Sequence, residues 1–557
     1  MNEALDQLAS EYWDYALSTS PTEALLLGDH RFDGEMEQFS RQAEDEQIER
    51  FTGFADAAVA IDDATLTADE RITKAVLIEE ASGRAGELRS RTAEFDVSPS
   101  WGLHVVLPQF TGQLPVMEEE HADAIVAKWS KLGTTFEQLI HRLRQGLAKD
   151  RIPPRTSVEK SIAQIDQYLS IPITEDPFVQ VPPPPSFAPE QVVAWQARLA
   201  QQVAGVIRPA YEAYRQELVD AVLPKARSEE KTGVRWLSDG EEVYARAIRR
   251  HTSLEMAPLD IHNIGLEEIA RLEGEYRKMG AEVLGTRDLA EIYDKLRNDP
   301  DLRFENGTQV VAAAQDAMDR AKAAIPDWFG RLPKADCVMD EIPEAGAQDA
   351  PIAYYLPPAT DGSRPGTYFI NTTEPTTRTR FESEALAFHE SIPGHHLQLA
   401  IAQELEGIPE FRKHALVTVY VEGWGLYTER LSDEMGLYSG PLQRMGMLSF
   451  DSWRAGRLVV DTGIHALGWS RQEAVDYLVD NSPLALNNIE SEVERYIGMP
   501  GQALAYMIGR REIMRLRTEA MRTMGSRFDI QGFHDTVLGS GPVPLGVLGD
   551  LVRAWAS

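Results

Sequence analysis

Apolar residues recur at three- and four-residue intervals along most of the first half of this chain. This spacing predicts helices, and it is clearest in residues 3–18, 37–61, 68–94, 115–148, 157–170, 189–222 and 264–283. Two of these segments start with a capping-box pattern, a hydroxyl residue followed three positions later by glutamate: Thr67 with Glu70, and Thr156 with Glu159. The pattern therefore predicts a mainly α fold.

A different pattern appears in the second half of the chain. The segments 352–356 and 367–371 are rich in β-branched and aromatic residues, which is typical of strands, and turn-forming residues fill Pro357 to Gly366 between them. A helix from about Arg380 to Phe388 is expected to follow. With 557 residues the chain exceeds the usual size of one domain. We therefore expect a helical N-terminal lobe, 1–232, and a second lobe, 233–557, with one continuous domain as the alternative.

Composition narrows the classes of function. The net charge of −33 argues against nucleic-acid binding, because a phosphate backbone would be repelled. Cys337 is the only cysteine, so no disulfide can form within the chain. No apolar run approaches the roughly 20 residues that span a bilayer. The first residues contain no basic segment followed by an apolar one, so no signal peptide is predicted and a cytoplasmic location is expected.

The segment His389-Glu390-Ser391-Ile392-Pro393-Gly394-His395-His396 carries the candidate chemistry. In the motif H-E-x-x-H, two histidines at i and i+4 bind zinc from one helical face, and the glutamate acts as general base. Here Pro393 occupies i+4. In a regular helix His395 would point about 120° away from His389, and His396 would lie roughly 10 Å further along the axis. A zinc site therefore requires a break in the helix.

Pro393 and Gly394 provide a reason for such a break. Proline has no N–H to donate and clashes with the carbonyl four residues back, and glycine tolerates unusual dihedral angles. A third ligand is available in Glu422, which follows the paired histidines by 26 and 27 residues. Two histidines, a carboxylate and an open fourth position are typical of a catalytic zinc site. The competing interpretation is a pair of polar surface histidines, since the chain has 12 histidines.

Several segments together resemble the DUF885 family of bacterial proteins, which is distantly similar to gluzincin metallopeptidases. They are Tyr354 to Pro358, Asp361 to Thr367, the H-E-x-x-P-G-H-H motif, Glu422 to Gly425, and Arg495-Tyr496 through Pro500 to Tyr506, with weaker likeness at Gly28-Asp29-His30. The resemblance covers most of the chain. It implies a large two-lobed helical fold, gluzincin-like, with a small β-sheet beside the zinc-site helix.

The resemblance also implies roles for individual residues. His389, His395 and Glu422 would hold one zinc ion per chain, with His396 as the alternative to His395. Glu390 would be the general base that takes a proton from zinc-bound water. Zinc lowers the pKa of that water towards about 7 and polarises the carbonyl that is attacked.

Other polar residues near the motifs have weaker assignments. Tyr506 and Tyr496 are candidate donors to the oxyanion of a transition state, and buried core tyrosines are the alternative. Tyr427 and Glu429 are expected to support the metal ligands. Arg364 and Arg495 are candidates for holding a substrate carboxylate, although structural ion pairs are the preferred interpretation. By analogy with gluzincins, the segment 367–371 would be an edge strand that pairs with substrate backbone, and the alternative is a small sheet that only closes the fold.

We conclude from the sequence that the chain is expected to be a zinc-dependent hydrolase, metallopeptidase-like, with a short peptide or small amide as substrate. The expected substrate site is a cleft between helical lobes, with residues 1–232 forming one wall. Two alternatives remain: a metal-dependent amidohydrolase or esterase acting on a non-peptide metabolite, and a non-catalytic binding protein on the same scaffold. The presence of Glu390 argues against a binding protein, which needs no general base.

Overall fold

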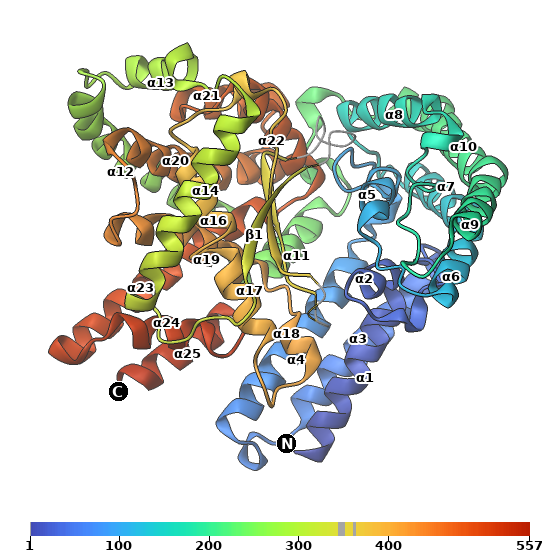
Figure 1. The fold of residues 1–557 in the computed structure, drawn as a ribbon, viewed down its shortest axis with the longest axis horizontal. Coiled ribbons are helices and arrows are strands. Elements are labelled where there is room, and N and C mark those ends of the chain that lie inside the picture. The colour runs from blue at the N-terminus through green and yellow to red at the C-terminus, as the bar shows by residue number, and fades with distance from the viewer. Residues whose placement is uncertain (1, 343–350, 360–361, 363) are drawn as a thin grey trace. The chain divides into compact units, whose positions relative to one another are not determined.

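The computed structural model describes residues 2–342, 351–359, 362 and 364–557 of the chain. These residues are mainly helical and include a small three-stranded sheet, which confirms the predicted fold class at this level (Figure 1). Thr360, Asp361 and Ser363, which belong to the turn-rich segment and to one of the family motifs, lie outside the described residues. None of the helices in the described part of the chain is long and apolar enough to cross a membrane.

The chain forms two compact units that are interleaved along the sequence. The N-terminal unit consists of Gln7–Ala57 and Ala81–Val243. Trp129, Phe136, Trp195 and Tyr211 are fully buried in its apolar core. Its helices are α2 (Pro21–Leu26), α3 (Arg41–Ala60), α5 (Leu103–Phe110), α6 (Glu119–Ser130), α7 (Leu132–Ala148), α8 (Arg155–Ser170), α9 (Pro189–Gln202) and α10 (Arg208–Glu217).

The C-terminal unit consists of Met1–Asp6, Ala58–Glu80 and Tyr244–Ser557. Helices α1 (Glu3–Thr19), α3, α4 (Ala68–Arg89) and α11 (Gly240–Thr252) have residues in both units. The remaining helices of this unit are α12 (Pro258–Val283), α13 (Leu289–Asn298), α14 (Gly307–Ala324), α16 (Ser383–Glu390), α17 (His395–Gln403), α18 (Glu410–Lys413), α19 (Thr418–Glu434), α20 (Pro441–Thr462), α21 (Arg471–Asn481), α22 (Leu486–Gly498), α23 (Ala505–Met524), α24 (Ile530–Leu538) and α25 (Leu545–Ala556).

All seven segments predicted from apolar spacing contain helix, although three of them are not single α-helices. In the segment 68–94, α4 ends at Arg89 and a separate 3-10 turn follows at Thr92–Glu94. The segment 115–148 divides at Lys131 into α6 and α7. In the segment 189–222, π-helical turns at Val203–Ile207 and Leu218–Val222 interrupt the α-helix. Pro209 and Pro224 follow these turns by two residues each. Because proline has no N–H to donate, the regular bonding pattern cannot pass through either position, and the turns widen just before it.

The two predicted capping boxes have different outcomes. Before α4, the Thr67 N–H donates to Glu70 Oε2 at 2.7 Å and the Glu70 N–H donates to Thr67 Oγ1 at 3.3 Å, so this prediction is confirmed. The prediction for Thr156 is wrong. Pro154 is extended and α8 begins at Arg155, whose N–H donates to the Arg227 carbonyl. Thr156 therefore lies inside the first turn, and its hydroxyl donates to Glu229 at 3.3 Å.

The sheet has the order β1-β3-β2. The predicted strands are present as β2 (Ala353–Leu356) and β3 (Gly366–Ile370), which pair antiparallel as a hairpin. The strand β1 (Cys337–Glu341) was not predicted, and it pairs with β3 in parallel. Both edges of β3 are therefore occupied. The expectation that residues 367–371 would form an edge strand for substrate backbone is wrong, because no backbone groups are left for another strand.

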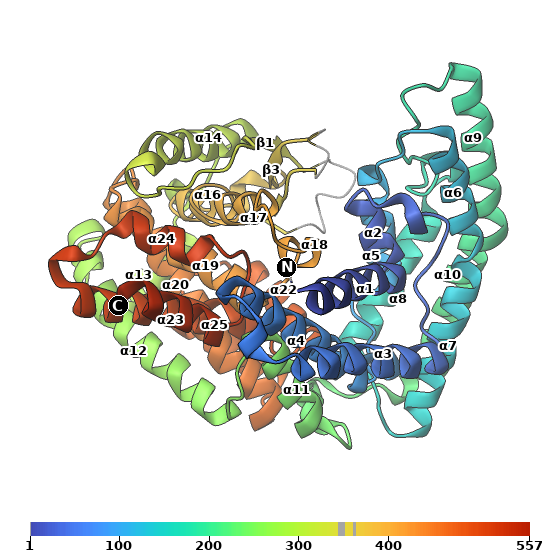
Figure 2. The ribbon, with the colours of Figure 1, turned by 90° about the horizontal axis from the view of Figure 1, so that it is seen from below.

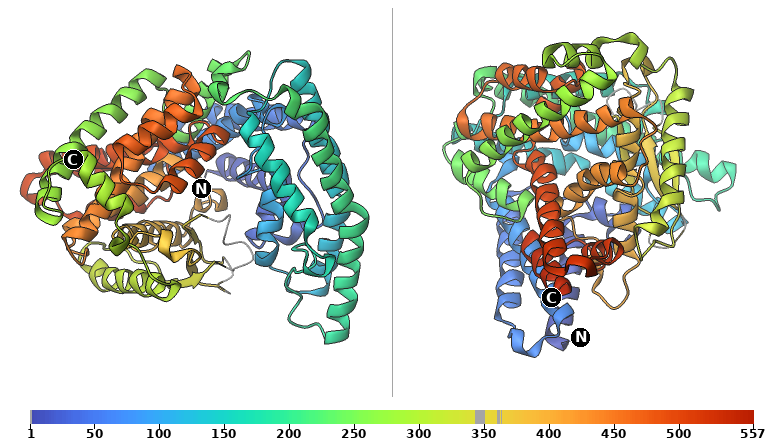
Figure 3. Two further views of the ribbon diagram at one scale, coloured as in Figure 1. Left: turned by 90° about the horizontal axis from the view of Figure 1, so that it is seen from above. Right: turned by 90° about the vertical axis from the view of Figure 1, so that its left-hand side faces the viewer.

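The motif helices α16 and α17 lie inside the C-terminal unit. They pack between α14 with the sheet on one side and α19 with α20 on the other (Figure 2). Helix α12 packs along α20, and α23 packs along α19 and against α25, which ends close to the C-terminus (Figure 3). The histidine motif is therefore held among helices and strands of the same unit.

Candidate metal centre

The expected break in the motif helix is present. Helix α16 ends at Glu390, and α17 begins five residues later at His395. Ser391 and Gly394 have non-helical ψ angles of −107° and −126°. The chain turns back so closely that a Cβ on Gly394 would lie 1.9 Å from the His389 carbonyl oxygen. This turn brings the His395 ring beside the His389 ring, with 4.8 Å between their centroids.

His389, His395 and Glu422 form a compact group of possible metal ligands. The distance from Glu422 Oε2 is 3.7 Å to His389 Nε2 and 3.5 Å to His395 Nε2. One ligand atom from each of the three side chains lies within 4.8 Å of the others. Ligand atoms held at 2.0–2.2 Å around a tetrahedral zinc ion would be about 3.4 Å apart. The two printed distances to Glu422 are close to that value, so the three side chains fit a zinc ion with little rearrangement.

A second carboxylate orients His389. The Nδ1 atom of the buried His389 lies 2.8 Å from Glu429 Oε1, and Glu429 has no exposed surface. A proton on Nδ1 is donated to this carboxylate, so the lone pair of Nε2 points toward Glu422 and His395. The sequence-based expectation placed Glu429 beside a metal ligand, and the structure places it in contact with His389.

Two glycines of α19 give the group its space. A Cβ on Gly425 would lie 2.7–3.0 Å from three atoms of the His389 ring. A Cβ on Gly423 would lie 2.5 Å from Gly509 Cα on α23. Glycine is unfavourable inside a helix by about 1 kcal/mol relative to alanine. Here one glycine admits the imidazole and the other admits the neighbouring helix.

His396 points away from the group. Its Nδ1 lies 2.8 Å from the hydroxyl of Tyr355 on β2, and its side chain is almost completely buried. Burial lowers the pKa of His396 to about 4, so the ring is neutral near pH 7. The structure thus brings His395 rather than His396 together with His389 and Glu422.

The charges around the group favour a cation. Burial alone would lower the pKa of His389, but its interactions with Glu422 and Glu429 raise it to about 9. Burial would raise the pKa of Glu422, and its contacts with both histidines lower it instead. The negative field that retains a proton on the His389 imidazole also attracts a metal ion.

Glu390 and Tyr506 lie at the edge of this group. Glu390 is half-buried at the end of α16, and burial raises its pKa while the charges of His389 and His395 oppose this. Tyr506 is also half-buried, with its ring centroid 6.2 Å from that of His389, and burial followed by the charge of Glu422 raises its pKa. Both predicted residues are therefore next to the ligand group and retain exposed surface.

Tyr496 has a different environment. It has no exposed surface, its hydroxyl donates to Glu492 at 2.7 Å, and the hydroxyl accepts from Trp453 Nε1 and Arg457 Nε at 2.9 Å each. A hydroxyl with all its hydrogen-bonding positions used has no donor left for a substrate. We therefore correct the assignment of Tyr496 from a catalytic donor to a buried tyrosine of the core.

The remaining sequence candidates make contacts within the protein. The Tyr427 hydroxyl lies 2.8 Å from His534 Nε2, and not beside the metal-ligand group. Arg495 binds Glu492 and Gln502, and Arg364 donates to the Pro357 carbonyl. Arg495 thus has the structural ion pair that the sequence interpretation preferred, whereas Arg364 bonds to backbone carbonyl groups.

Two residues near the site were missed from the sequence. Arg454 and Arg457 lie one turn apart on α20, and both are almost completely buried. Both guanidinium groups stack on Trp453, and the Arg457 group also lies 4.3 Å from the ring centroid of Tyr506. The signal that was available is a pair of arginines at i and i+3 next to a tryptophan, with apolar residues soon after.

The N-terminal unit contains a second group with the same residue types: His30, Asp33 and His121. His30 Nδ1 lies 2.7 Å from Asp33 Oδ2, and His121 Nδ1 accepts a hydrogen bond from the Met117 N–H at 3.3 Å. The two rings are stacked, with 3.6 Å between centroids and an angle of 8° between planes. Their lone pairs lie in parallel planes and do not converge.

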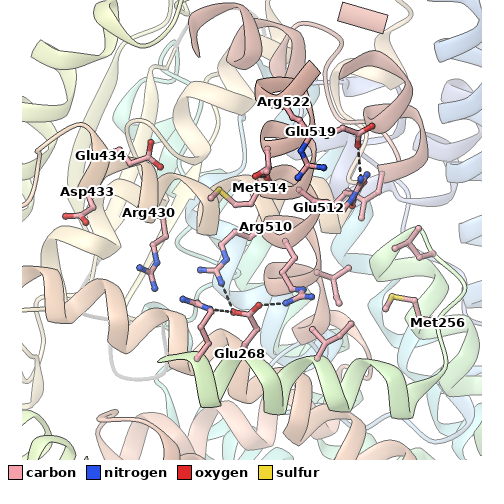
Figure 4. Close-up of a pocket in the computed structure, with 18 residues that line it drawn as sticks. Met256, Glu268, Arg430, Asp433, Glu434, Arg510, Glu512, Met514, Glu519 and Arg522 are labelled. Carbon is pink, nitrogen blue, oxygen red and sulfur yellow. Dashed lines mark hydrogen bonds and ion pairs between the residues drawn. The ribbon is translucent and has the colours of Figure 1, made fainter. Parts of the chain in front are cut away.

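The C-terminal unit also has a cavity of about 1050 Å³ that none of these residues line. Figure 4 shows Glu268 in its wall with three bonded arginines, which are Arg271, Arg510 and Arg511. Arg515 is paired with Glu512 and Glu519 in the same way. Glu268, Glu512, Glu519 and these arginines are therefore paired within the protein, and they indicate no particular ligand.

Comparison with known proteins gives a family and a fold. The model of a family described as bacterial protein of unknown function (DUF885) matches residues 21–552. A crystal structure of a protein from Colwellia psychrerythraea is similar over 100% of both chains, with a TM-score of 0.91 and 26% identity. A structure from Shewanella oneidensis has a TM-score of 0.76 and 19% identity over 99% of both chains. Both are described as a "putative lipoprotein", the second one as of unknown function. No curated protein matches the chain.

Proposed function

The chain belongs to the DUF885 family, and because the family is described only as of unknown function, we propose a function from the geometry of its own residues. The proposal is a zinc-dependent hydrolase that cleaves an amide bond in short peptides. The observation that carries it is the convergence of His389 Nε2 and His395 Nε2 on one oxygen of Glu422, with Glu390 adjacent. This arrangement supports our proposal of a gluzincin-like site with an altered helix.

Each residue has a role that follows from its position. A zinc ion bound by His389, His395 and Glu422 would polarise the carbonyl that is attacked and make water more acidic. Glu390 accepts the proton of the attacking water and passes it to the leaving amine. Its half-exposed position and raised pKa suit both steps. Glu429 keeps His389 in the orientation that binds the cation.

Tyr506 is the proposed donor to the developing oxyanion. Among the described residues its hydroxyl accepts one long hydrogen bond, from Gln502 at 3.5 Å, and donates to none, so its proton remains available to a substrate. A single donor of this kind is commonly worth about 3–4 kcal/mol in the transition state. Tyr506→Phe is expected to lower kcat about a hundredfold or more and to leave metal affinity unchanged.

A combined test uses metal content and a peptide screen. We expect about one zinc ion per chain by mass spectrometry of the untagged protein, and hydrolysis of members of a short-peptide library. Glu390→Gln should lower kcat by about 10²–10⁴ and retain the zinc. Glu406→Gln is the matched control, because Glu406 is exposed on the loop after α17. Hydrolysis by the Glu390 variant at the wild-type rate would refute the mechanism, and an absence of bound zinc after incubation with zinc would refute the site.

A further inference from the structure

Arg454 carries a buried charge that the protein leaves without hydrogen bonds. Its side chain is 4% exposed, and neither Nε nor Nη1 has a hydrogen-bond partner among the described residues. Its third nitrogen, Nη2, comes within 3.9 Å of Glu429 Oε1, too far for a hydrogen bond. Burying an ionised group normally costs several kcal/mol unless it is paired and hydrogen-bonded.

The surroundings of Arg454 hold the guanidinium in place without neutralising it. Its Cζ atom lies 4.4 Å from the ring centroid of Phe450 and 4.1 Å from that of Trp453. Glu429 is its nearest carboxylate, and this group already accepts the proton of His389 Nδ1. Burial, together with the nearby charge of Arg457, lowers the pKa of Arg454, while Glu429 opposes the shift.

Three positive side chains gather here, and we call Arg454, Arg457 and Arg495 the arginine group. Glu492 accepts hydrogen bonds from Arg457 and Arg495 and is the one carboxylate bonded directly to the group in the described structure. Other carboxylates, Glu390, Glu429 and Glu382, interact with Arg454 only at longer range. The arginine group therefore has more positive charge than its bonded partners compensate.

The arginine group is adjacent to the candidate metal centre. The ring of Tyr506 lies between them: its centroid is 4.3 Å from Arg457 Cζ, 5.8 Å from Arg454 Cζ and 6.2 Å from the His389 ring. Tyr506 and Arg495 retain exposed surface, whereas Arg454 and Arg457 lie behind them. A molecule that reaches Glu390 and Tyr506 would thus enter the field of the three guanidinium groups.

We propose that the arginine group binds a carboxylate of the substrate, so that this protein cleaves short peptides near a free C-terminal carboxylate. The inference rests on the proposed hydrolase function and specifies its substrate class. Arg495 contacts the carboxylate through the N–H groups that Glu492 and Gln502 do not use, and Arg454 supplies the charge behind it. A guanidinium fork matches the two oxygens of a carboxylate, which explains arginine at these positions better than lysine would.

The first experiment compares three versions of one peptide with the wild-type, zinc-loaded protein. They are a short N-acetylated peptide with a free C-terminus, the same peptide with a C-terminal amide, and the amide with glutamate in the last position. We expect kcat/KM to fall about 100-fold on amidation, because a buried charge loses its partner. Recovery with the glutamate peptide would indicate that a side-chain carboxylate also serves. Equal cleavage of acid and amide would overturn the inference and leave the hydrolase function intact.

Variants test whether the arginine group causes the preference for a free C-terminal carboxylate. Arg454→Met should reduce the acid-to-amide ratio of kcat/KM toward 1, and Arg454→Lys should retain part of it. Arg515→Met is the control, since Arg515 is exposed and paired with glutamates on α23. An unchanged ratio in folded Arg454→Met would contradict the assignment.

A binding measurement tests the carboxylate site even if the proposed hydrolase function is wrong. If no peptide is hydrolysed, calorimetry can still measure the affinity of the zinc-loaded Glu390→Gln protein for the N-acetylated peptide as free acid and as amide. Tighter binding of the free acid than of the amide, by about tenfold or more, supports the carboxylate site. Equal affinities would overturn it.

Discussion

The C-terminal and N-terminal units each bring two histidines and one carboxylate together, and the two groups are built differently. In His389, His395 and Glu422 the rings are nearly perpendicular, with an interplanar angle of 86°, and both Nε2 atoms approach the same oxygen. In His30, Asp33 and His121 the rings are parallel at 8°, and the carboxylate bonds one ring directly. The same residue types thus form a site that fits a metal in one unit and a stacked pair in the other.

The difference shows that the direction of the lone pairs decides whether a group can bind a metal. Glu429 takes the proton of His389 Nδ1 and leaves Nε2 free to bind a cation. His121 uses Nδ1 to accept the Met117 N–H, so the lone pair of this nitrogen is not available to a cation. Proximity alone would have ranked the two groups equally.

The largest expected effect separates the two groups directly. His389→Ala removes a ligand from the converging group, and we expect the zinc content to fall from about one per chain to near zero. His30→Ala should leave the zinc content unchanged, because the stacked rings do not bind metal. Mass spectrometry of both purified variants measures this. A loss of zinc in the His30 variant would show that our comparison of the two groups is wrong.

A smaller effect is expected when the supporting carboxylate is neutralised. Glu429→Gln keeps the shape of the side chain but weakens the orientation of His389, so zinc affinity should fall by about 10–100-fold. Asp33→Asn makes the same change beside His30, and zinc affinity should not change. Competition with a zinc chelator measures both affinities. Equal zinc affinities of the two variants would contradict the different roles of Glu429 and Asp33.

Substitutions at the adjacent residues His395 and His396 should have different effects, one on zinc binding and the other on stability. His396→Phe removes a hydrogen-bond partner of the half-buried Tyr355 hydroxyl, and the free energy of unfolding should fall by about 1 kcal/mol. The zinc content should remain, because His396 points toward β2. His395→Phe should instead lose zinc. Urea unfolding and metal analysis of the two variants test the contrast, which fails if the His396 variant loses its zinc.

The smallest expected effect concerns the two capping-box sequences, one in each unit. Thr67→Ala should cost about 1 kcal/mol of stability, within the range of 0.5–2 kcal/mol for a lost cap. Thr156→Ala should cost less than about 0.5 kcal/mol, as for an ordinary surface position. Urea unfolding measures both, and equal losses would mean that Thr156 acts as a cap.

Local sequence patterns predicted much of the fold. Seven helical segments follow from apolar spacing, and the hairpin of β2 and β3 follows from β-branched and aromatic residues around a turn. The strand β1 was missed because Asp340 and Glu341 make up two of its five residues, and acidic residues are unfavourable in strands. The start of α8 was missed by two residues because Pro154 sets it ahead of Thr156.

The candidate site could be predicted from the sequence where the role of a residue depends on residues next to it in the sequence. Pro393 and Gly394 predict a break whatever surrounds them, and Glu390 is adjacent to His389 in sequence. The choice between His395 and His396 depends on Tyr355, about 40 residues earlier, and the environment of Tyr496 depends on Trp453 and Arg457 of another helix. Such contacts arise from tertiary packing, which no local pattern in a single sequence encodes.

The glycines of α19 limit how this protein can be engineered for heat resistance. Replacing a helical glycine with alanine normally stabilises a protein by about 0.5–1 kcal/mol. Gly53 of α3 and Gly274 of α12 are exposed, with nothing within 4 Å of an added Cβ, and are suitable positions. At Gly425 the same substitution would displace His389, and at Gly423 it would separate α19 from α23. A library that treats all helical glycines alike would gain stability at the first two and disrupt the candidate metal centre at the others.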